Sequence, residues 1–169
     1  VSHQSYTHKM LTGRKDAFLN PEDYDVVSGY TNPRESGHDF FTIGHTSTSV
    51  SLACGLAKAR DLKGGHENII AVIGDGSLSG GEAYEGLSNA GEMGTNLIIV
   101  VNDNEPNCSS YDARKYGAYW AAYDVPRHLW HFTPATIQKL GSRHGFILAE
   151  RHPMPFDAFY VSMLTEKNM

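Results

Sequence analysis

Two short apolar runs with a helical segment between them constrain the fold of this chain more than any other feature. Residues 68–73 (NIIAVI) and 96–101 (NLIIVV) are rich in β-branched residues, as are strands buried on both faces of a parallel sheet. Residues 80–93 carry apolar side chains at helical spacing. Strand, helix and strand in this order predict a βαβ unit with two parallel strands.

A second helix is predicted before this unit. Ser47 or Thr48 can cap a helix that runs to about Lys63, because small and apolar side chains recur there at helical spacing. Gly64 follows and would end the helix. Residues 1–46 show no long periodic element, so they are predicted to be rich in loops.

The last third of the chain predicts one more helix and two strands. Thr133 precedes Pro134, a good pair for a helix N-terminus, and this helix is expected to reach about His144. Residues 146–151 and 158–165 predict strands joined by a turn. We therefore expect an α/β fold: a three-layer, mostly parallel sheet with an antiparallel C-terminal edge hairpin.

Composition narrows the classes of function. The 169 residues fit one domain, and a net charge of −5 without a basic stripe argues against nucleic-acid binding. No run of about 18 apolar residues occurs, so no membrane span is predicted. Cys54 and Cys108 do not make a disulfide framework. Cys54 lies in an apolar run and is expected to be a buried thiol, in a reducing, cytoplasmic setting.

Polar residues follow both predicted strands of the βαβ unit. Asp75 lies between Gly74 and Gly76 directly after the first strand, and residues 102–104 (NDN) follow the second. Ligands of open α/β sheets bind beyond the carboxyl ends of the strands. Carboxylate and carboxamide oxygens suit Mg²⁺, and glycines let the backbone approach a phosphate. The pattern predicts a diphosphate held through a divalent ion; a turn aspartate plus a helix-capping asparagine is the alternative.

Three runs of sequence, in the same order, resemble the thiamine-diphosphate-binding part of 1-deoxy-D-xylulose-5-phosphate synthases, a family of transketolase-like enzymes. The runs are SHQSYTHKMLTGRKD (2–16), GHTSTSVSLACGLAKARDLKG (44–64) and AVIGDGSLSGGEAYEGLSNAGEMGTNLIIVVNDNE (71–105). The resemblance therefore extends over residues 2–105.

The resemblance implies a metal site and a cofactor site at the matching positions. Asp75, Asn104 and the backbone carbonyl of Pro106 would hold Mg²⁺. His8 and His45 match two active-site histidines, and imidazole suits proton transfer near neutral pH. The positions that would contact thiamine diphosphate are Gly74, Gly76, Ser77, Asn104 and His45.

By the same resemblance, the chain would belong to a transferase that joins pyruvate and glyceraldehyde 3-phosphate with loss of carbon dioxide. Such a reaction serves isoprenoid precursor and thiamine biosynthesis, and the cofactor performs its carbon chemistry. The implied partners are these small molecules, and a homodimer is left open. The family's other active-site groups lie in further domains, so this chain is expected to be a fragment that keeps the half-site and is inactive alone.

The remainder of the chain resembles a different family. Residues 106–167 are similar to the C-terminal end of class I S-adenosylmethionine-dependent methyltransferases, most clearly in DVPRHLWHFTP (124–134). No glycine-rich methyl-donor loop follows a strand. We therefore predict one hybrid domain, residues 1–169, whose methyltransferase-like segment (106–169) is structural. A hybrid domain without ligand function and a methyltransferase-related protein lacking its donor site are the alternatives.

Overall fold

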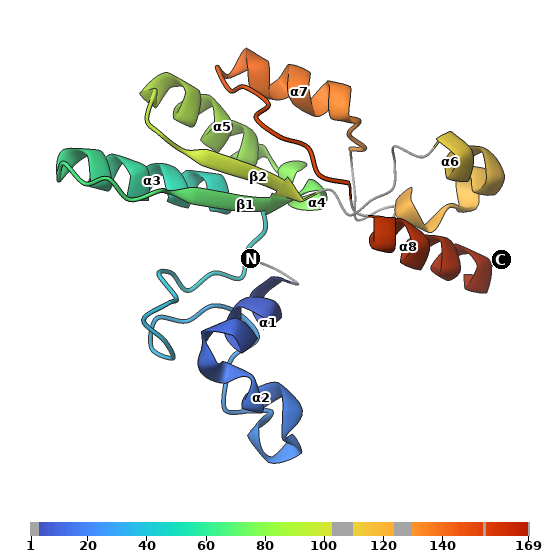
Figure 1. Cartoon of the computed structure of the whole chain (residues 1–169), viewed down its shortest axis with the longest axis horizontal. Helices are drawn as coiled ribbons and strands as arrows, with labels where there is room; N and C mark the ends of the chain where they lie inside the picture. The colour runs from blue at the N-terminus through green and yellow to red at the C-terminus, as the bar shows by residue number, and fades with distance from the viewer. Residues whose placement is uncertain (1–3, 103–109, 124–129, 154, 169) are drawn as a thin grey trace. The chain divides into compact units, whose positions relative to one another are not determined.

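The computed structural model describes residues 4–102, 110–123, 130–153 and 155–168, which form two compact units. The N-terminal unit is Val1–Thr46 and the C-terminal unit is Ser47–Met169 (Figure 1). The α/β class is confirmed, because the C-terminal unit contains a parallel sheet with helices packed on it. The predicted hybrid domain, in which a synthase-like segment gives way to a methyltransferase-like segment near residue 105, stays a prediction.

The N-terminal unit begins as a series of short helices and continues as a loop. Residues 24–46 contain no helix, and one antiparallel bridge joins Thr31 to Ile43. The prediction of a loop-rich segment is confirmed for these residues and wrong for residues 4–23. The helical elements there are α1 (Gln4–Lys9), the π-helical turn η1 (Met10–Arg14), α2 (Asp16–Leu19) and the 3-10 turn η2 (Pro21–Asp23).

Polar contacts explain why hydrophobic spacing did not reveal these short helices. The backbone of Gly13, with φ of 89°, leaves helical geometry within η1, so no apolar period runs through the segment. The hydroxyl of Ser5 donates a hydrogen bond to the carbonyl oxygen of Gly29 at 3.0 Å. Lys9 is fully buried and pairs with Glu35. Helices this short depend on such tertiary contacts, because they are marginal in isolation.

The C-terminal unit begins with the predicted helices and strands. Its first elements are α3 (Ser49–Leu62), β1 (Ile70–Gly74), the short helix α4 (Asp75–Leu78), α5 (Gly81–Met93) and β2 (Ile98–Asn102). The two strands are parallel, with Ile70 opposite Ile98 and Gly74 opposite Asn102. The predicted α3, β1, α5 and β2 are confirmed to within about two residues at each end.

Helices α3 and α5 approach each other closely on one face of this sheet. A Cβ atom added to Gly86 would lie 2.9 Å from Ser51 Oγ and 3.2 Å from Val50 Cβ, so only glycine permits this spacing. Cys54 is buried at the same contact, which confirms the predicted buried thiol, and burial raises its pKa. The core cluster is Val50, Ala53, Cys54, Ala71, Ile73, Leu78, Ala83, Leu87 and Ala90.

The two faces of the sheet have different environments. Ala71 and Ile73 are buried among side chains of α3 and α5, which lie along one face (Figure 1). Within the described residues the sheet has two strands, and the alternate side chains of both strands are exposed. The predicted three-layer arrangement is therefore not confirmed. The apolar side chains of the open face are Ile70, Val72, Ile98 and Val100.

Helix α7 (Pro134–Arg143) and the residues that flank it pack onto this core. Thr133 accepts a hydrogen bond from the backbone N–H of Thr136 in a capping box, as the Thr-Pro pair predicts. A Cβ atom at Gly91 of α5 would overlap the carbonyl oxygen of His144. Ile137, Leu140 and Phe146 pack against the core cluster. The predicted helix at 134–144 is thus confirmed.

The predicted C-terminal hairpin is wrong. Residues 146–151 form no strand, and residues 158–165 lie within helix α8 (Pro155–Asn168). Proline at the first position of α8 favours a helix N-terminus, and Thr165 Oγ1 donates to the Val161 carbonyl at 2.9 Å, one turn earlier. The aromatic and β-branched residues of this run favour a strand by composition. The run is helical because the helix packs Val161 against a small second cluster of buried residues.

That second cluster joins α8 to the aromatic segment before α7. The segment contains α6 (Ser110–Tyr116) and the 3-10 turns η3 (Gly117–Tyr119) and η4 (Ala121–Tyr123). Tyr116 and Trp120 are buried, and Val161 of α8 packs against them. The backbone N–H of Ala121 donates to Thr165 Oγ1 at 3.0 Å. Tyr116 and Trp120 therefore belong to a small core of their own.

Candidate functional site

Asp75 lies where the sequence predicts a ligand site, at the carboxyl end of β1. It is the first residue of α4, and only 5% of its surface is exposed. Gly74 pairs with Asn102, so the ends of β1 and β2 lie side by side. The predicted ligands Asn104 and Pro106 lie outside the described residues. A buried carboxylate at paired strand ends is thus the part of the predicted metal site that falls within the described residues.

The loop around α4 is tied to the start of α3. The hydroxyl of Ser47 donates to the carbonyl oxygen of Ser77 at 2.6 Å, and Ser47 holds a left-handed backbone with φ of 72°. A Cβ atom at Gly80 would overlap the Ser47 side chain. Strained backbone of this kind persists where the surroundings fix it, and it is common at binding sites. The predicted cofactor residues Gly74, Gly76 and Ser77 all lie in this tied segment.

Two hydroxyls on the same segments lack a partner. The Oγ atoms of Ser49, at the start of α3, and Ser79, just after α4, are buried and have no hydrogen-bond partner among the described residues. A buried hydroxyl without a partner costs about 1–3 kcal/mol, so it is normally satisfied by water or a ligand. Donors of this type suit the oxygens of a diphosphate.

The two predicted catalytic histidines lie in the other unit. His8 is in the last turn of α1, and His45 is an exposed residue next to the end of the N-terminal unit. The structure brings neither of them to a defined distance from Asp75, because the two units are described separately. Their participation in one site with Asp75 stays a prediction.

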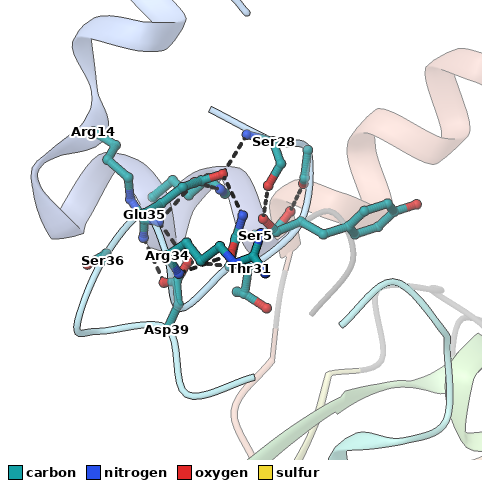
Figure 2. Close-up of polar contacts among 12 residues, drawn as sticks. Ser5, Arg14, Ser28, Thr31, Arg34, Glu35, Ser36 and Asp39 are labelled. Carbon is teal, nitrogen blue, oxygen red and sulfur yellow. Dashed lines mark hydrogen bonds and ion pairs between the residues drawn. The ribbon is translucent and has the colours of Figure 1, made fainter. Parts of the chain in front are cut away.

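His8 belongs to a network of charged side chains that sequence reasoning missed. His8 Nε2 lies 2.7 Å from Asp39 Oδ1. Arg14 makes a bidentate contact with the same carboxylate: Nη1 donates to Oδ2 at 2.7 Å, and Nη2 donates to Oδ1 at 2.8 Å. Figure 2 shows Arg14, Glu35 and Asp39 directed toward one another. The only signal in the sequence was the presence of basic residues in a loop-rich segment, and nothing in it paired them with Glu35 or Asp39.

The same network contains a second buried ion pair. Lys9 Nζ donates to Glu35 Oε2 at 2.5 Å, and the backbone N–H of Ser28 donates to Glu35 Oε1 at 2.8 Å. Burial alone raises the pKa of Glu35, but the hydrogen bonds from Lys9 and Ser28 outweigh it and lower the pKa to about 2. Hydrogen bonds from Arg14, opposed by burial, hold the pKa of Asp39 far below its usual value.

These lowered pKa values predict acid sensitivity of the N-terminal unit. Between about pH 4.5 and about pH 2 the unfolded chain binds a proton at Glu35 that the folded unit does not. The stability of the unit is therefore full above this window and falls as the pH falls through it. Amide NMR signals of residues 4–46 should disperse less as pH is lowered and recover on return. Glu35→Gln should weaken this pH dependence; an unchanged profile would contradict the assignment.

Other site types find less support in the described part of the chain. Among these residues, no group of three or more His, Cys, Asp or Glu side chains could hold a metal ion by itself. None of the helices described is long and apolar enough to cross a lipid bilayer. A polar depression of about 290 Å³ lies between α5 and the end of α7, lined by Ser88, Gly91, Glu92, Arg143, His144 and Gly145.

Comparisons with known proteins agree with the first of the two resemblances. The family model for 1-deoxy-D-xylulose-5-phosphate synthase matches residues 1–115. The match thus extends into α6, past the boundary near residue 105 that was predicted between the two segments. The comparisons contain nothing that bears on a methyltransferase-like segment.

Individual relatives show the same pattern. The 1-deoxy-D-xylulose-5-phosphate synthase 1 of Geobacter sulfurreducens is 50% identical over 128 residues, which cover 71% of this chain and 20% of that protein. The synthase of Desulforudis audaxviator is 52% identical over 118 residues, covering 70% and 18%. That of Symbiobacterium thermophilum is 56% identical over 104 residues, covering 62% and 16%. The chain spans a fifth or less of the length of these relatives.

Proposed function

Because this chain belongs to the 1-deoxy-D-xylulose-5-phosphate synthase family, we propose that it carries the magnesium and thiamine diphosphate half-site of such an enzyme. The whole enzyme would join pyruvate to glyceraldehyde 3-phosphate. The observation that carries the proposal is the buried carboxylate of Asp75 at the end of β1, with the end of β2 paired directly beside it. This is the edge of a parallel sheet at which ligands bind.

The chemistry of the residues proposed for this site suits the cofactor. Mg²⁺ takes oxygen ligands and uses few of them from protein, so Asp75, Asn104 and the Pro106 carbonyl would suffice together with diphosphate oxygens. The buried Oγ atoms of Ser49 and Ser79 lack partners among the described residues and could donate to the diphosphate. When bound, thiamine diphosphate would supply the carbanion on which the carbon chemistry depends. The other contacts proposed are Gly74, Gly76, Ser77 and His45.

His8 and His45 are proposed to move protons at the reacting groups. A histidine ring can accept or release a proton near neutral pH, which suits it to this role. Support for His8 comes from its contacts. Its side chain is partly exposed, and its Nε2 is held by the buried carboxylate of Asp39. The proposal for this chain is limited to cofactor binding and proton handling, because its relatives are about five times longer than the matched region.

Residues 116–169 are proposed to have a structural role. Support comes from the packing of α7 on the core cluster and of α8 on the aromatic cluster. The predicted resemblance of residues 106–167 to methyltransferases would then reflect helical structure rather than methyl-donor binding. Self-association into a homodimer is compatible with this role.

Titration calorimetry tests the proposal. Adding thiamine diphosphate in the presence of Mg²⁺ should release or absorb saturable heat, and omitting Mg²⁺ should abolish it. Asp75→Ala should abolish the heat as well, because it removes a carboxylate ligand of the cation. Glu82→Ala is the matched control, since Glu82 is an exposed carboxylate in the first turn of α5. S-adenosylmethionine should give no heat.

Two results would contradict the proposal. One is the absence of saturable heat from folded wild-type chain at millimolar cofactor and Mg²⁺. The other is heat that persists unchanged in Asp75→Ala. Heat with S-adenosylmethionine alone would instead favour the methyltransferase-related alternative.

A further inference from the structure

We infer that Asp39 is a positioning residue that fixes His8 in the tautomer with its proton on Nε2, so that Nδ1 is the ring's proton acceptor. The inference rests on the proposed function, in which His8 handles a proton. It adds two residues that would act through His8: Asp39, which contacts the ring, and Arg14, which holds Asp39. The observation behind it is the number of donors that converge on one carboxylate.

The carboxylate of Asp39 is saturated with donors. Its Oδ2 accepts from Arg14 Nη1 at 2.7 Å and from the backbone N–H of Asn32 at 2.7 Å. Its Oδ1 accepts from Arg14 Nη2 at 2.8 Å and lies 2.7 Å from His8 Nε2. An ionised carboxylate has no proton to give, so the nitrogen of His8 that faces it must be the donor.

The ionised state of Asp39 is itself secured by its surroundings. Its side chain is fully buried, and a buried carboxylate without a cation would take up a proton. Arg14 prevents this, because its guanidinium forms a two-point contact with both oxygens. Lys9 and Glu35 balance each other beside it, so the four charged groups sum to zero.

The second ring nitrogen of His8, Nδ1, is not engaged in the network. The side chain of His8 is 36% exposed, although the Asp39 carboxylate that its Nε2 contacts is fully buried. Within the part of the chain that the structure describes, no polar group bonds Nδ1. A ring bonded to a carboxylate at one nitrogen and left without a bond at the other is the arrangement by which a carboxylate sets the tautomer of a catalytic histidine. An ion pair that only joined the helix to the loop would not need one ring nitrogen bonded and the other left unbonded.

The tautomer can be measured directly by long-range ¹H–¹⁵N NMR of the histidine rings in the full, ¹⁵N-labelled chain above neutral pH. His8→Gln identifies the His8 signals by their loss. The expected result is a dominant Nε2–H form for His8 in the wild-type chain without cofactor. His38 is the internal reference, because it is exposed and adjacent to Asp39 in sequence.

Asp39→Asn is the decisive variant. The amide oxygen should stay where Arg14 Nη1 and Asn32 fix it, which turns the amide NH₂ toward His8 Nε2. His8 should then change from mostly Nε2–H to mostly Nδ1–H. Arg14→Lys keeps a cation beside Asp39 and should retain the wild-type tautomer.

Every outcome of these measurements decides the inference. A wild-type His8 that is mostly Nδ1–H, or that has the same tautomer ratio as His38, overturns it even if no variant folds. So does a folded Asp39→Asn chain whose His8 tautomer is unchanged. None of these readouts uses cofactor, so a failure of thiamine diphosphate to bind would count against the proposed function alone.

Discussion

Replacing Arg14 with alanine is expected to destabilise the N-terminal unit by about 3–5 kcal/mol, because it removes one partner of a buried ion pair and leaves the other charge behind. Asp39 would keep its bond from the backbone of Asn32 but lose both guanidinium contacts. Its pKa should rise toward or above the usual value once the hydrogen bonds that lower it are gone.

Hydrogen exchange of backbone amides measures this loss within one unit. Protection of residues 4–46 should fall in Arg14→Ala, whereas β1 and β2 should keep theirs. Arg34→Ala is the control, because Arg34 is an exposed arginine of the same unit whose hydrogen bond to Asn32 uses only its backbone N–H. Equal loss in both variants, or none in Arg14→Ala, would show that the network does not hold the unit together.

Replacing Arg60 with alanine is expected to cost the C-terminal unit about 3 kcal/mol. Arg60 lies buried in α3, and its Nη1 donates at 2.9 Å to the carbonyl oxygens of both Glu67 and Asn96. These carbonyls precede β1 and β2, so one guanidinium clamps the N-terminal ends of both strands. A hydrogen bond from a charged donor contributes about 1.5–3 kcal/mol, and here two are lost together.

Urea denaturation followed by far-UV circular dichroism tests this expectation. The midpoint for Arg60→Ala should be clearly lower than for wild type, with a similar dependence on urea. Lys58→Ala is the matched control, since Lys58 is an exposed cation on the same helix. Because Arg60 lies at the end of the sheet opposite Asp75, its loss should lower stability without abolishing cofactor heat in the chain that remains folded. A midpoint equal to that of the control would contradict the clamp.

The central βαβ segment was predictable because several local signals agree there. The two apolar runs match buried strands, the intervening residues match an amphipathic helix, and Gly94 ends that helix in a left-handed conformation (φ 58°). Thr133 and Pro134 likewise marked the start of α7 from two residues alone. Where residue propensity, hydrophobic period and capping residues all favour the same secondary structure, tertiary contacts rarely alter it.

The errors lie where tertiary context overrides local pattern. Residues 158–165 have the composition of a strand, yet they form part of α8 because Val161 and Thr165 pack against the aromatic segment around Trp120. Residues 4–23 are helical without an apolar face, because a buried lysine and a buried serine replace it. Neither choice is visible in the spacing of hydrophobic residues.

The place in the fold could be predicted from the sequence for one residue of the candidate site, Asp75, and not for the others. Asp75 could be placed from sequence because it directly follows a strand, and strand ends define the ligand edge. The pairing of Asp39 with His8 spans 31 residues of loop, so no periodic rule predicts it. Asn104 and Pro106 lie outside the described residues, and their roles stay predictions.

The contact between Gly91 and His144 has a consequence for how the last helices are attached. What meets the bare α-carbon of Gly91 is a backbone oxygen, which every amino acid at position 144 would supply. At this one contact the attachment therefore excludes a methyl group on α5 and does not depend on which side chain stands at position 144. A different helical segment could keep this backbone contact only if residue 91 stays glycine, and it would still have to supply apolar side chains in place of Ile137, Leu140 and Phe146.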